Sequence, residues 1–233
     1  MLRDLTLLYQ PRKDHYRYLA PFYERLVRLV FGTALHQAHH EALLLGLPVA
    51  CDNTLHIWIG GGTGYSINEV MRNLPKTKLL YIEASQSMMK QAQQRLLPEY
   101  ENRVQWLNTT HDVLYSSEMS SYLNNFNRLY LMSFFFMDVL KEDDCRILMR
   151  WAKQHQILGW FFADFVQQKK WHYQGLIRFM YLCFTLTTGI SQRTLLDLKS
   201  IYLEEGWWPR GQKKVQAKGL VESYYFEPNL TTE

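Results

Sequence analysis

Four glycines within five positions directly follow the apolar run Leu55–Ile59: Gly60, Gly61, Gly62 and Gly64. A ligand that carries a nucleoside must meet the backbone at close range, and glycine permits this at a strand-to-helix turn because it has no Cβ. Glu83 ends the next apolar run, at the distance of about 20 residues where a carboxylate commonly accepts hydrogen bonds from ribose hydroxyls. Strand, glycine turn and acid together predict a site for a nucleoside cofactor.

The glycine spacing also indicates which nucleoside cofactors are disfavoured. The dinucleotide fingerprint G-x-G-x-x-G needs a glycine where Tyr65 stands when counted from Gly60, and where Ile67 stands when counted from Gly62. The phosphate-binding pattern G-x-x-x-x-G-K-[ST] is also missing from the sequence. The pattern therefore favours a cofactor that has a nucleoside but no pyrophosphate.

Two later apolar runs end in further candidate site residues. In an open α/β sheet the ligand lies outside the carboxyl ends of the strands, so the residues at the ends of the fourth and fifth expected strands should face it. These residues are Ser133, the run Phe134–Phe136, Asp164 and Phe165. Phenylalanines in such a run more often serve simple core packing, and Asp164 equally suits capping of a following helix. Both alternatives stay open.

Three histidines share one face of an expected helix. His36, His39 and His40 have the i, i+3, i+4 spacing that can hold zinc. No carboxylate motif of a zinc site accompanies them, so we expect a packed or solvated histidine face and no metal.

Apolar runs and amphipathic segments alternate along the chain, which predicts a parallel sheet with helices on both faces. The five expected parallel strands are Leu55–Ile59, Leu79–Ile82, Val104–Leu107, Leu129–Ser133 and Gly159–Ala163. The expected helices are Tyr65–Arg72, Met88–Leu97, Asp143–His155, Trp171–Leu186 and Gln192–Glu204, with one or two more over Tyr16–Leu47. Trp207–Val215 and Leu220–Phe226 flank a turn and suit an antiparallel pair. We therefore expect an α/β, Rossmann-like, mostly parallel seven-stranded sheet with a C-terminal hairpin and an N-terminal helical cap.

Length and composition predict one domain over residues 1–233, with a helical cap at 1–50, a cofactor-binding core at 51–166 and substrate-side helices with the hairpin at 167–233. The net charge of +4 at pH 7 does not suggest a nucleic-acid partner. Three widely spaced cysteines, charges among the first 30 residues and the lack of a long apolar run favour a cytoplasmic protein without a membrane segment, although peripheral membrane contact stays possible. Monomer and homodimer both remain open.

Two stretches of the sequence resemble a known family, the class I S-adenosylmethionine-dependent methyltransferases. His56–Gly64 is similar to the first motif of the family, and Tyr81–Ala92 is similar to the second, in which an acid, a small residue, Ser and Met recur at these spacings. Within the family, the resemblance is greatest to the small-molecule branch of the ubiquinone and menaquinone biosynthesis methyltransferases. It implies S-adenosylmethionine as the cofactor and S-adenosylhomocysteine as its product.

The resemblance also implies roles for individual residues. Gly60, Gly62 and Gly64 would line the methionine and ribose part, Glu83 would hold the ribose hydroxyls, and Ala84 and Met88 would border the adenine. Thr110, His111 and Asp112 are joint candidates for the adenine amino group, and Ser133 and Phe134 match a position that touches the cofactor. Family members usually carry an acid where Trp58 stands, and an indole cannot accept the hydrogen bonds of that acid.

We expect methyl transfer to a small, partly apolar molecule by in-line displacement, in which proximity and orientation supply most of the rate and a general base is optional. Aromatic side chains that could cover a sulfonium are Tyr16 and Tyr23 ahead of the sheet, with His172 and Tyr173 after the fifth strand. Asp164, His172 and Tyr173 are the weak catalytic candidates. The alternatives are an aminopropyltransferase of the polyamine-synthase type and a non-catalytic S-adenosylmethionine-binding protein.

Overall fold

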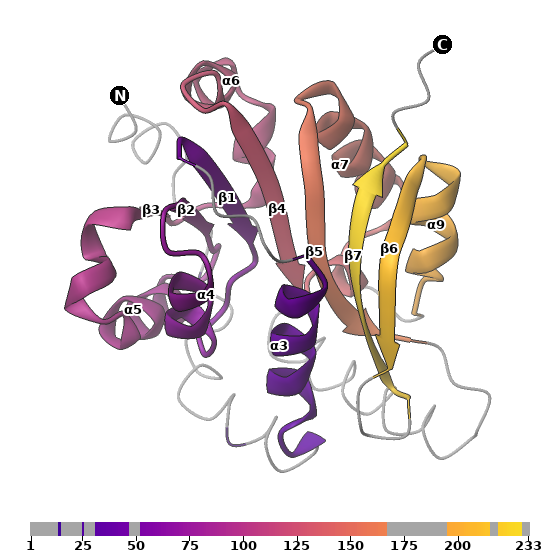
Figure 1. Ribbon diagram of the computed structural model, residues 1–233, viewed down its shortest axis with the longest axis horizontal. Helices are drawn as coiled ribbons and strands as arrows, with labels where there is room; N and C mark the ends of the chain where they lie inside the picture. Colours follow the sequence, from indigo (N-terminus) through magenta and orange to yellow (C-terminus); the bar gives the residue numbers. More distant parts are fainter. Residues whose placement is uncertain are drawn as a thin grey trace.

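The computed structural model describes Asp14, Arg25 and residues 31–46, 52–166, 195–214 and 219–229. These residues build a seven-stranded sheet with the strand order β3-β2-β1-β4-β5-β7-β6 (Figure 1). The strands are β1 Thr54–Ile59, β2 Lys78–Ile82, β3 Val104–Leu107, β4 Arg128–Phe134, β5 Ile157–Phe165, β6 Trp207–Lys214 and β7 Val221–Pro228. β1 to β5 pair in parallel, whereas β7 pairs antiparallel with both β5 and β6. The predicted Rossmann-like sheet with its C-terminal hairpin is confirmed.

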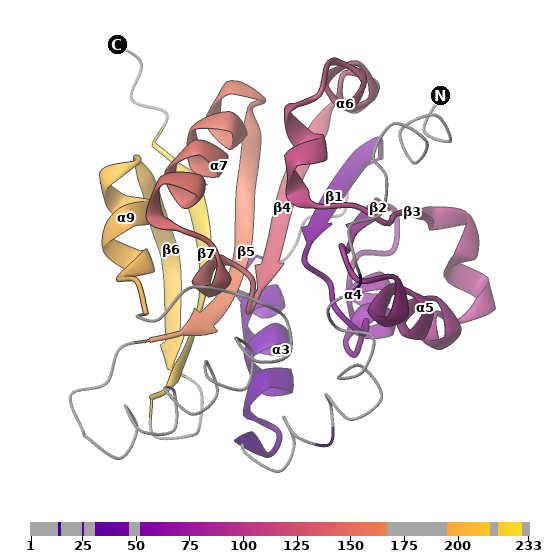
Figure 2. The same cartoon turned by 180° about the vertical axis from the view of Figure 1, so that it is seen from behind.

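Helices cover both faces of this sheet, as Figures 1 and 2 show from opposite sides. One face carries α3 Ala34–Gly46, α4 Ile67–Asn73 and α5 Gln86–Arg95. The other carries α6 Ser117–Leu123, α7 Glu142–Gln154 and α9 Leu198–Glu204. Three short 3-10 helices complete the described elements: η1 Pro98–Arg103, η2 His111–Tyr115 and η3 Met137–Val139. Among the described residues, no helix has the length and apolar character needed to cross a membrane.

The apolar run of β1 is continuous because both of its faces are covered. Successive side chains of a strand point to opposite faces. Leu55, Ile57 and Ile59 therefore pack into the core beneath α6 and α7, while Trp58 packs into the core beneath α3. This alternation brings the Trp58 indole under the first described helix.

Helix boundaries follow local capping. Ser85 caps α5 by accepting a hydrogen bond from the backbone N–H of Met88, and Ser116 caps α6 in the same way through Met119. The expected helix over Gln192–Glu204 is too long, because Leu195 to Asp197 lie outside it and the Asp197 side chain caps a helix that begins at Leu198. α6 has no counterpart among the expected helices.

The first described helix lies against the last strand. α3 packs on β5 and β7, and the hydroxyl of Ser223 on β7 donates a hydrogen bond to the carbonyl of Ala38 at 2.9 Å. At the end of α3 the backbone approaches so closely that a Cβ on Gly46 would collide with the rings of Phe161 and Tyr225. α3 is thereby fixed over the centre of the sheet.

Candidate functional site

The glycine turn leaves β1 at the edge where the parallel strands end. Gly60, Gly62 and Gly64 have φ angles of 63°, 63° and 67°, in the left-handed region that side chains disfavour. A Cβ on Gly61 would collide with the Tyr81 ring, while one on Gly64 would meet Ala92 Cβ at 2.6 Å. The turn therefore needs glycine both for its backbone angles and for its close packing against β2 and α5.

Glu83 ties this turn to the start of α5. Its Oε2 accepts a hydrogen bond from the N–H of Gly62 at 2.8 Å, and its Oε1 accepts one from the N–H of Ser85 at 2.7 Å. Burial raises the pKa of the Glu83 carboxyl, and the two backbone donors oppose that rise. Each oxygen has a further lone pair, so the carboxylate can still accept hydrogen bonds from a pair of hydroxyl groups.

A cavity of about 230 Å³, here called the cofactor cavity, opens beside Glu83. It brings together half of the predicted cofactor-binding residues: Gly60, Gly62, Glu83, Ala84, Met88, Thr110 and His111. Its position at the ends of β1 to β4 is the position that an open α/β sheet gives to its ligand.

The residues of the cofactor cavity fit a ligand that carries a nucleoside. Ile59, Ile82 and Met88 supply apolar walls that suit an adenine ring, and the Glu83 carboxylate suits the ribose hydroxyls. A Cβ built on Gly62 would meet no atom within 4 Å, so the turn leaves open space for a ligand at this point. The residues present therefore suit S-adenosylmethionine.

Other predicted site residues lie elsewhere. Gly61 and Phe134 line a second cavity, Gly64 packs against α5, and Asp112 is exposed and accepts a hydrogen bond from the Thr110 hydroxyl at 2.7 Å. Ser133 is fully buried, and its hydroxyl accepts a hydrogen bond from the Trp160 indole at 2.8 Å, so its side chain lines neither cavity. The predictions for Tyr16, Tyr23, His172 and Tyr173 fall outside the described residues.

Asp164 is buried beneath the site rather than exposed in it. Its Oδ1 accepts a hydrogen bond from the N–H of Phe165 at 2.8 Å, and its Oδ2 accepts one from the N–H of Asp138 at 3.2 Å. Burial raises the pKa of the Asp164 carboxyl well above its usual value, and the nearby Asp138 carboxyl adds to this rise. Asp138 lines the cofactor cavity, so Asp164 supports the turn that presents Asp138.

Two further residues help to build the site: one belongs to the predicted run Phe134–Phe136, and sequence reasoning missed the other. Phe135 directly follows β4, adopts a φ of 55° and lines both cavities. Its place at the carboxyl end of a strand is the signal from which the sequence predicted it. Asp14 accepts hydrogen bonds from the Ser85 hydroxyl and from the N–H and hydroxyl of Ser87 at the start of α5. No sequence pattern connects Asp14 to a helix about 70 residues later.

The second cavity, of about 250 Å³, lies under α3 on the other side of the glycine turn. His36 and His39 line it, together with Tyr65 and Phe134. Within the described ranges, no cluster of His, Cys, Asp or Glu is placed to hold a metal ion. The three histidines instead contact α4: His39 Nδ1 lies 2.7 Å from the Ser66 hydroxyl, while His36 and His40 contact Glu69.

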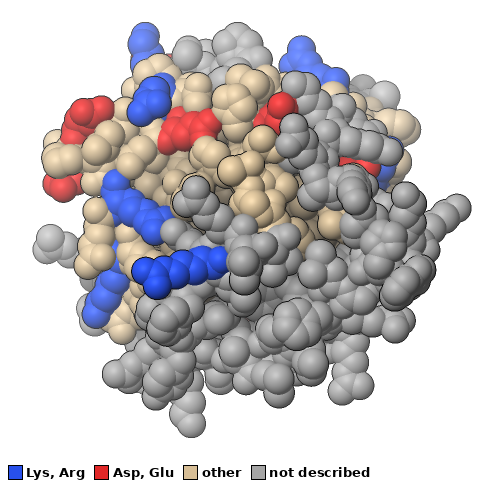
Figure 3. Space-filling view, turned by 90° about the horizontal axis from the view of Figure 1, so that it is seen from below, with Lys and Arg blue, Asp and Glu red and all other residues tan. Residues whose placement is uncertain are grey.

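Figure 3 shows the molecule from below, the side toward which β4 and β5 point in Figure 1. Among the described residues visible there, lysine and arginine side chains gather toward one side, and acidic side chains are interspersed among other groups. The described part of this face is thus mixed in charge.

The sequence matches no model of a known protein family, and no curated protein matches it. Solved structures do match the fold. The mitomycin 7-O-methyltransferase MmcR is 14% identical with a TM-score of 0.55, covering 88% of this chain and 57% of that protein. TnmH is 12% identical with a TM-score of 0.57, and the match covers 94% of this chain and 62% of the TnmH chain. A chain of the complex between the Haloferax volcanii Trm112 methyltransferase activator and a methyltransferase is 9% identical with a TM-score of 0.59. The match covers 95% of this chain and 99% of that chain.

The chain therefore has the fold of the class I S-adenosylmethionine-dependent methyltransferases. It spans less than two thirds of the length of MmcR and of TnmH. The finer resemblance to the ubiquinone and menaquinone branch is not confirmed by these structures and stays a prediction.

Proposed function

We propose that this protein is an S-adenosylmethionine-dependent methyltransferase that acts on a small, partly apolar molecule. The observation that carries this proposal is the position of Glu83. This buried carboxylate joins the glycine turn to the start of α5 and lines the cofactor cavity, whose apolar walls suit an adenine ring. The methyltransferase fold of the solved structures supports the same proposal.

In this proposal the residues of the site bind S-adenosylmethionine and orient it. Glu83 accepts hydrogen bonds from the ribose hydroxyls, Ala84 and Met88 flank the adenine, and the turn at Gly60 and Gly62 lets the backbone approach the methionine part. S-adenosylmethionine supplies an electrophilic methyl group on a sulfonium. Because an in-line displacement of this kind depends mainly on alignment, the principal task of the chain is to hold two ligands at the correct separation and angle.

The aminopropyltransferase alternative is less favoured. That chemistry needs aspartates at the end of the fourth strand, and β4 ends in Ser133 and Phe134, with Asp138 as the nearest acid. A binding protein without catalysis remains a possible outcome of the tests, because Trp58 stands at the usual position of an acid. Detection of a methylated product distinguishes the enzyme from the binder.

Replacement of Glu83 tests the cofactor assignment. Each hydrogen bond to a charged group is worth about 1.5–3 kcal/mol. We therefore expect Glu83→Gln to weaken S-adenosylhomocysteine binding at least about tenfold, as measured by isothermal titration calorimetry. The exposed acid Glu101 provides a matched control, and Glu101→Gln should bind as the unaltered protein does.

Two results would contradict the assignment. One is an unchanged dissociation constant in a Glu83→Gln protein with a native circular dichroism spectrum. The other is binding of NAD⁺ as tight as that of S-adenosylhomocysteine, because the glycine spacing disfavours a pyrophosphate.

A further inference from the structure

The cofactor cavity and the second cavity meet at one thin wall. Gly60, Gly62 and Phe135 line both of them. Since two of these three residues are glycines, little more than backbone separates the contents of the two cavities at this point. A ligand in the second cavity therefore lies next to the part of the site where the proposed function places the methionine end of the cofactor.

His39 is the polar side chain best held in the wall of the second cavity. Its ring stacks on Phe134 at a centroid distance of 4.4 Å and an interplanar angle of 26°, and it meets Trp58 edge-on at 6.2 Å. Its Nδ1 lies 2.7 Å from the Ser66 hydroxyl. Two aromatic rings and one hydrogen bond thus fix both the plane and the rotation of the imidazole.

Ser66 is committed to this contact rather than to its own helix. It occupies the N-cap position of α4, where a serine hydroxyl normally accepts a hydrogen bond from a backbone N–H, but its side chain forms no such bond. The hydroxyl lies instead 2.7 Å from His39 and 3.4 Å from His36. The Ser66 hydroxyl therefore helps to fix the orientation of the His39 imidazole instead of capping α4.

The second nitrogen of His39 is available to a ligand. Nε2 has no hydrogen-bond partner in the part of the chain that the structure describes. Burial lowers the pKa of His39 to about 3, with a smaller contribution from His36, so the ring is neutral at physiological pH. When Nδ1 donates its proton to Ser66, Nε2 carries a lone pair and can accept a proton.

Charged and titratable groups surround His39 on several elements. His36 and His40 lie on its own helix, where both contact Glu69 of α4. Arg25 and Tyr65 line the same cavity. Glu69 contacts the two outer histidines, His36 and His40, so the neutral state of His39 does not depend on a direct ion pair.

We propose that the second cavity holds the methyl acceptor, an aromatic molecule with a hydroxyl group, and that Nε2 of His39 accepts the proton of that hydroxyl. This assignment rests on the proposed function. The aromatic character follows from Phe134, Phe135 and Tyr65, which offer flat apolar walls, and the hydroxyl follows from the proton acceptor among them.

The step balances in atoms and charge. The acceptor oxygen forms a bond to the methyl carbon, the carbon–sulfur bond breaks with its electron pair remaining on sulfur, and the hydroxyl proton moves to Nε2. One positive charge leaves the sulfur and one arrives on the imidazole. The total charge of the buried site is therefore unchanged, so burial opposes the protonated imidazole no more than it opposed the sulfonium.

His39→Phe removes the base and keeps an aromatic ring against Phe134. With S-adenosylmethionine and 2-naphthol at pH 8, we expect kcat for formation of the methyl ether to fall about 10²–10⁴-fold, as measured by mass spectrometry. With 4-nitrophenol, which is already largely ionised at that pH, the fall should be at least tenfold smaller, because an ionised acceptor needs no base. The dissociation constant of S-adenosylhomocysteine should be unchanged.

A binding measurement accompanies the kinetics. Addition of 2-naphthol to the protein loaded with S-adenosylhomocysteine should shift the imidazole resonances of His39 in the NMR spectrum. The matched control is His155 on α7, whose Nε2 lies 3.2 Å from the Ser120 hydroxyl and which lines neither cavity. His155→Phe should leave both phenol activities unchanged.

The outcomes separate the two proposals. Equal losses for both phenols in His39→Phe would show that His39 only packs, and would overturn the inference. Binding of S-adenosylhomocysteine without methyl transfer to either phenol would also overturn it, while leaving the cofactor assignment intact. Absence of S-adenosylhomocysteine binding in the unaltered protein would instead refute the proposed function.

Discussion

His56 lies in the middle of β1 and is completely buried. Its imidazole stacks on the ring of Tyr130 at 5.0 Å, and neither ring nitrogen has a hydrogen-bond partner among the described residues. Burial lowers the pKa of His56 to about 3 from an ordinary value of 6.5. Between these two pH values His56 is protonated in the unfolded chain and neutral in the folded chain. The free energy of unfolding therefore decreases as the pH falls below 6.5.

His56→Phe should reduce this dependence on pH. One fewer proton taken up on unfolding changes the slope by about 1.4 kcal/mol per pH unit. We expect the free energy of unfolding of His56→Phe, measured by urea denaturation, to fall less steeply than that of the unaltered protein between pH 6 and pH 4. Tyr130→Phe keeps the stack and should show the unaltered slope. Parallel curves for His56→Phe and the unaltered protein would contradict the assignment.

Trp58 shows what a single residue changes at the glycine turn. The indole is buried and meets the rings of Tyr81 at 5.2 Å and Phe134 at 5.5 Å, so the space of the usual acid belongs to an aromatic cluster. The same cluster carries His39. Under the proposed function, Trp58 therefore both replaces the acid that is usual in the family and packs against the imidazole of His39.

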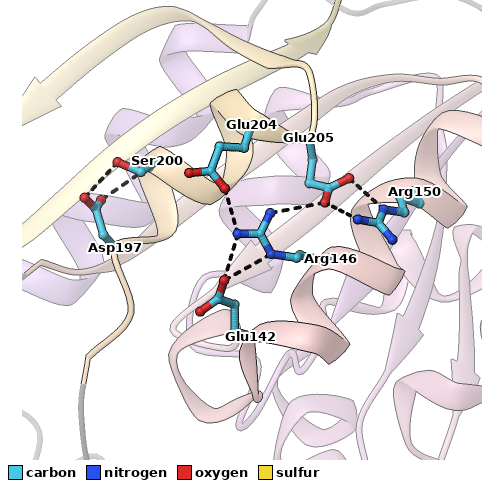
Figure 4. Close-up of polar contacts among 7 residues, drawn as sticks. All are labelled: Glu142, Arg146, Arg150, Asp197, Ser200, Glu204 and Glu205. Carbon is cyan, nitrogen blue, oxygen red and sulfur yellow. Dashed lines mark hydrogen bonds and ion pairs between the residues drawn. The ribbon is translucent and has the colours of Figure 1, made fainter.

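At the scale of elements, an ionic network joins α7 to the end of α9 (Figure 4). The guanidinium of Arg146 donates to Glu142 and Glu204 at 2.7 Å each and to Glu205 at 3.3 Å. Arg150 contacts Glu205 at 2.7 and 2.9 Å and, together with Arg146, lowers the pKa of that carboxyl. Because several charges share the network, it is worth more than an isolated surface pair.

Removal of the shared arginine should loosen the α7–α9 junction. We expect Arg146→Met to lower Tm in 50 mM salt by roughly 2–4 °C. This is the shift that a loss of about 1 kcal/mol in the free energy of unfolding produces in a domain of this size. The difference should narrow in 1 M salt, where the screening length falls to about 3 Å. The control is Arg72→Met, because Arg72 is an exposed arginine of α4 that forms no ion pair with the described residues. A difference that persists at high salt would indicate a packing effect of the Arg146 stem rather than an ionic one.

At the scale of the molecule, the contact of α3 with β7 holds the first described helix over the site. The hydroxyl of Ser223 is completely buried. We expect Ser223→Ala to lower the free energy of unfolding by about 1 kcal/mol in urea denaturation, since a buried hydrogen bond contributes about that amount. Ser121→Ala removes an exposed hydroxyl on α6 and should change stability by less than about 0.5 kcal/mol. Equal effects of the two substitutions would contradict this.

The sheet was predictable because parallel strands that are covered on both faces have largely apolar sequences. β1 illustrates this, since the expected strand Leu55–Ile59 lies within the observed Thr54–Ile59, which is buried throughout. α6 was not predictable, because only two of its seven residues, Met119 and Leu123, are buried. The proximity of Glu83 to the glycine turn could be predicted from spacing, and the backbone N–H of Gly62 does donate a hydrogen bond to the Glu83 carboxylate. The second cavity could not be predicted, because it depends on contacts between His39, Phe134 and Ser66 that no local sequence pattern indicates.

The junction of α3 with β7 also sets the order in which the protein can assemble. Ser223 and Ala38 are 185 residues apart, so α3 leaves the ribosome long before the strand that holds it is synthesised. Long-range contacts of this kind form late. We therefore expect the apolar face of α3 to stay incompletely covered, and the edge of β5 that pairs with β7 to stay open, until translation reaches β7; exposed surfaces of this kind are what chaperones bind.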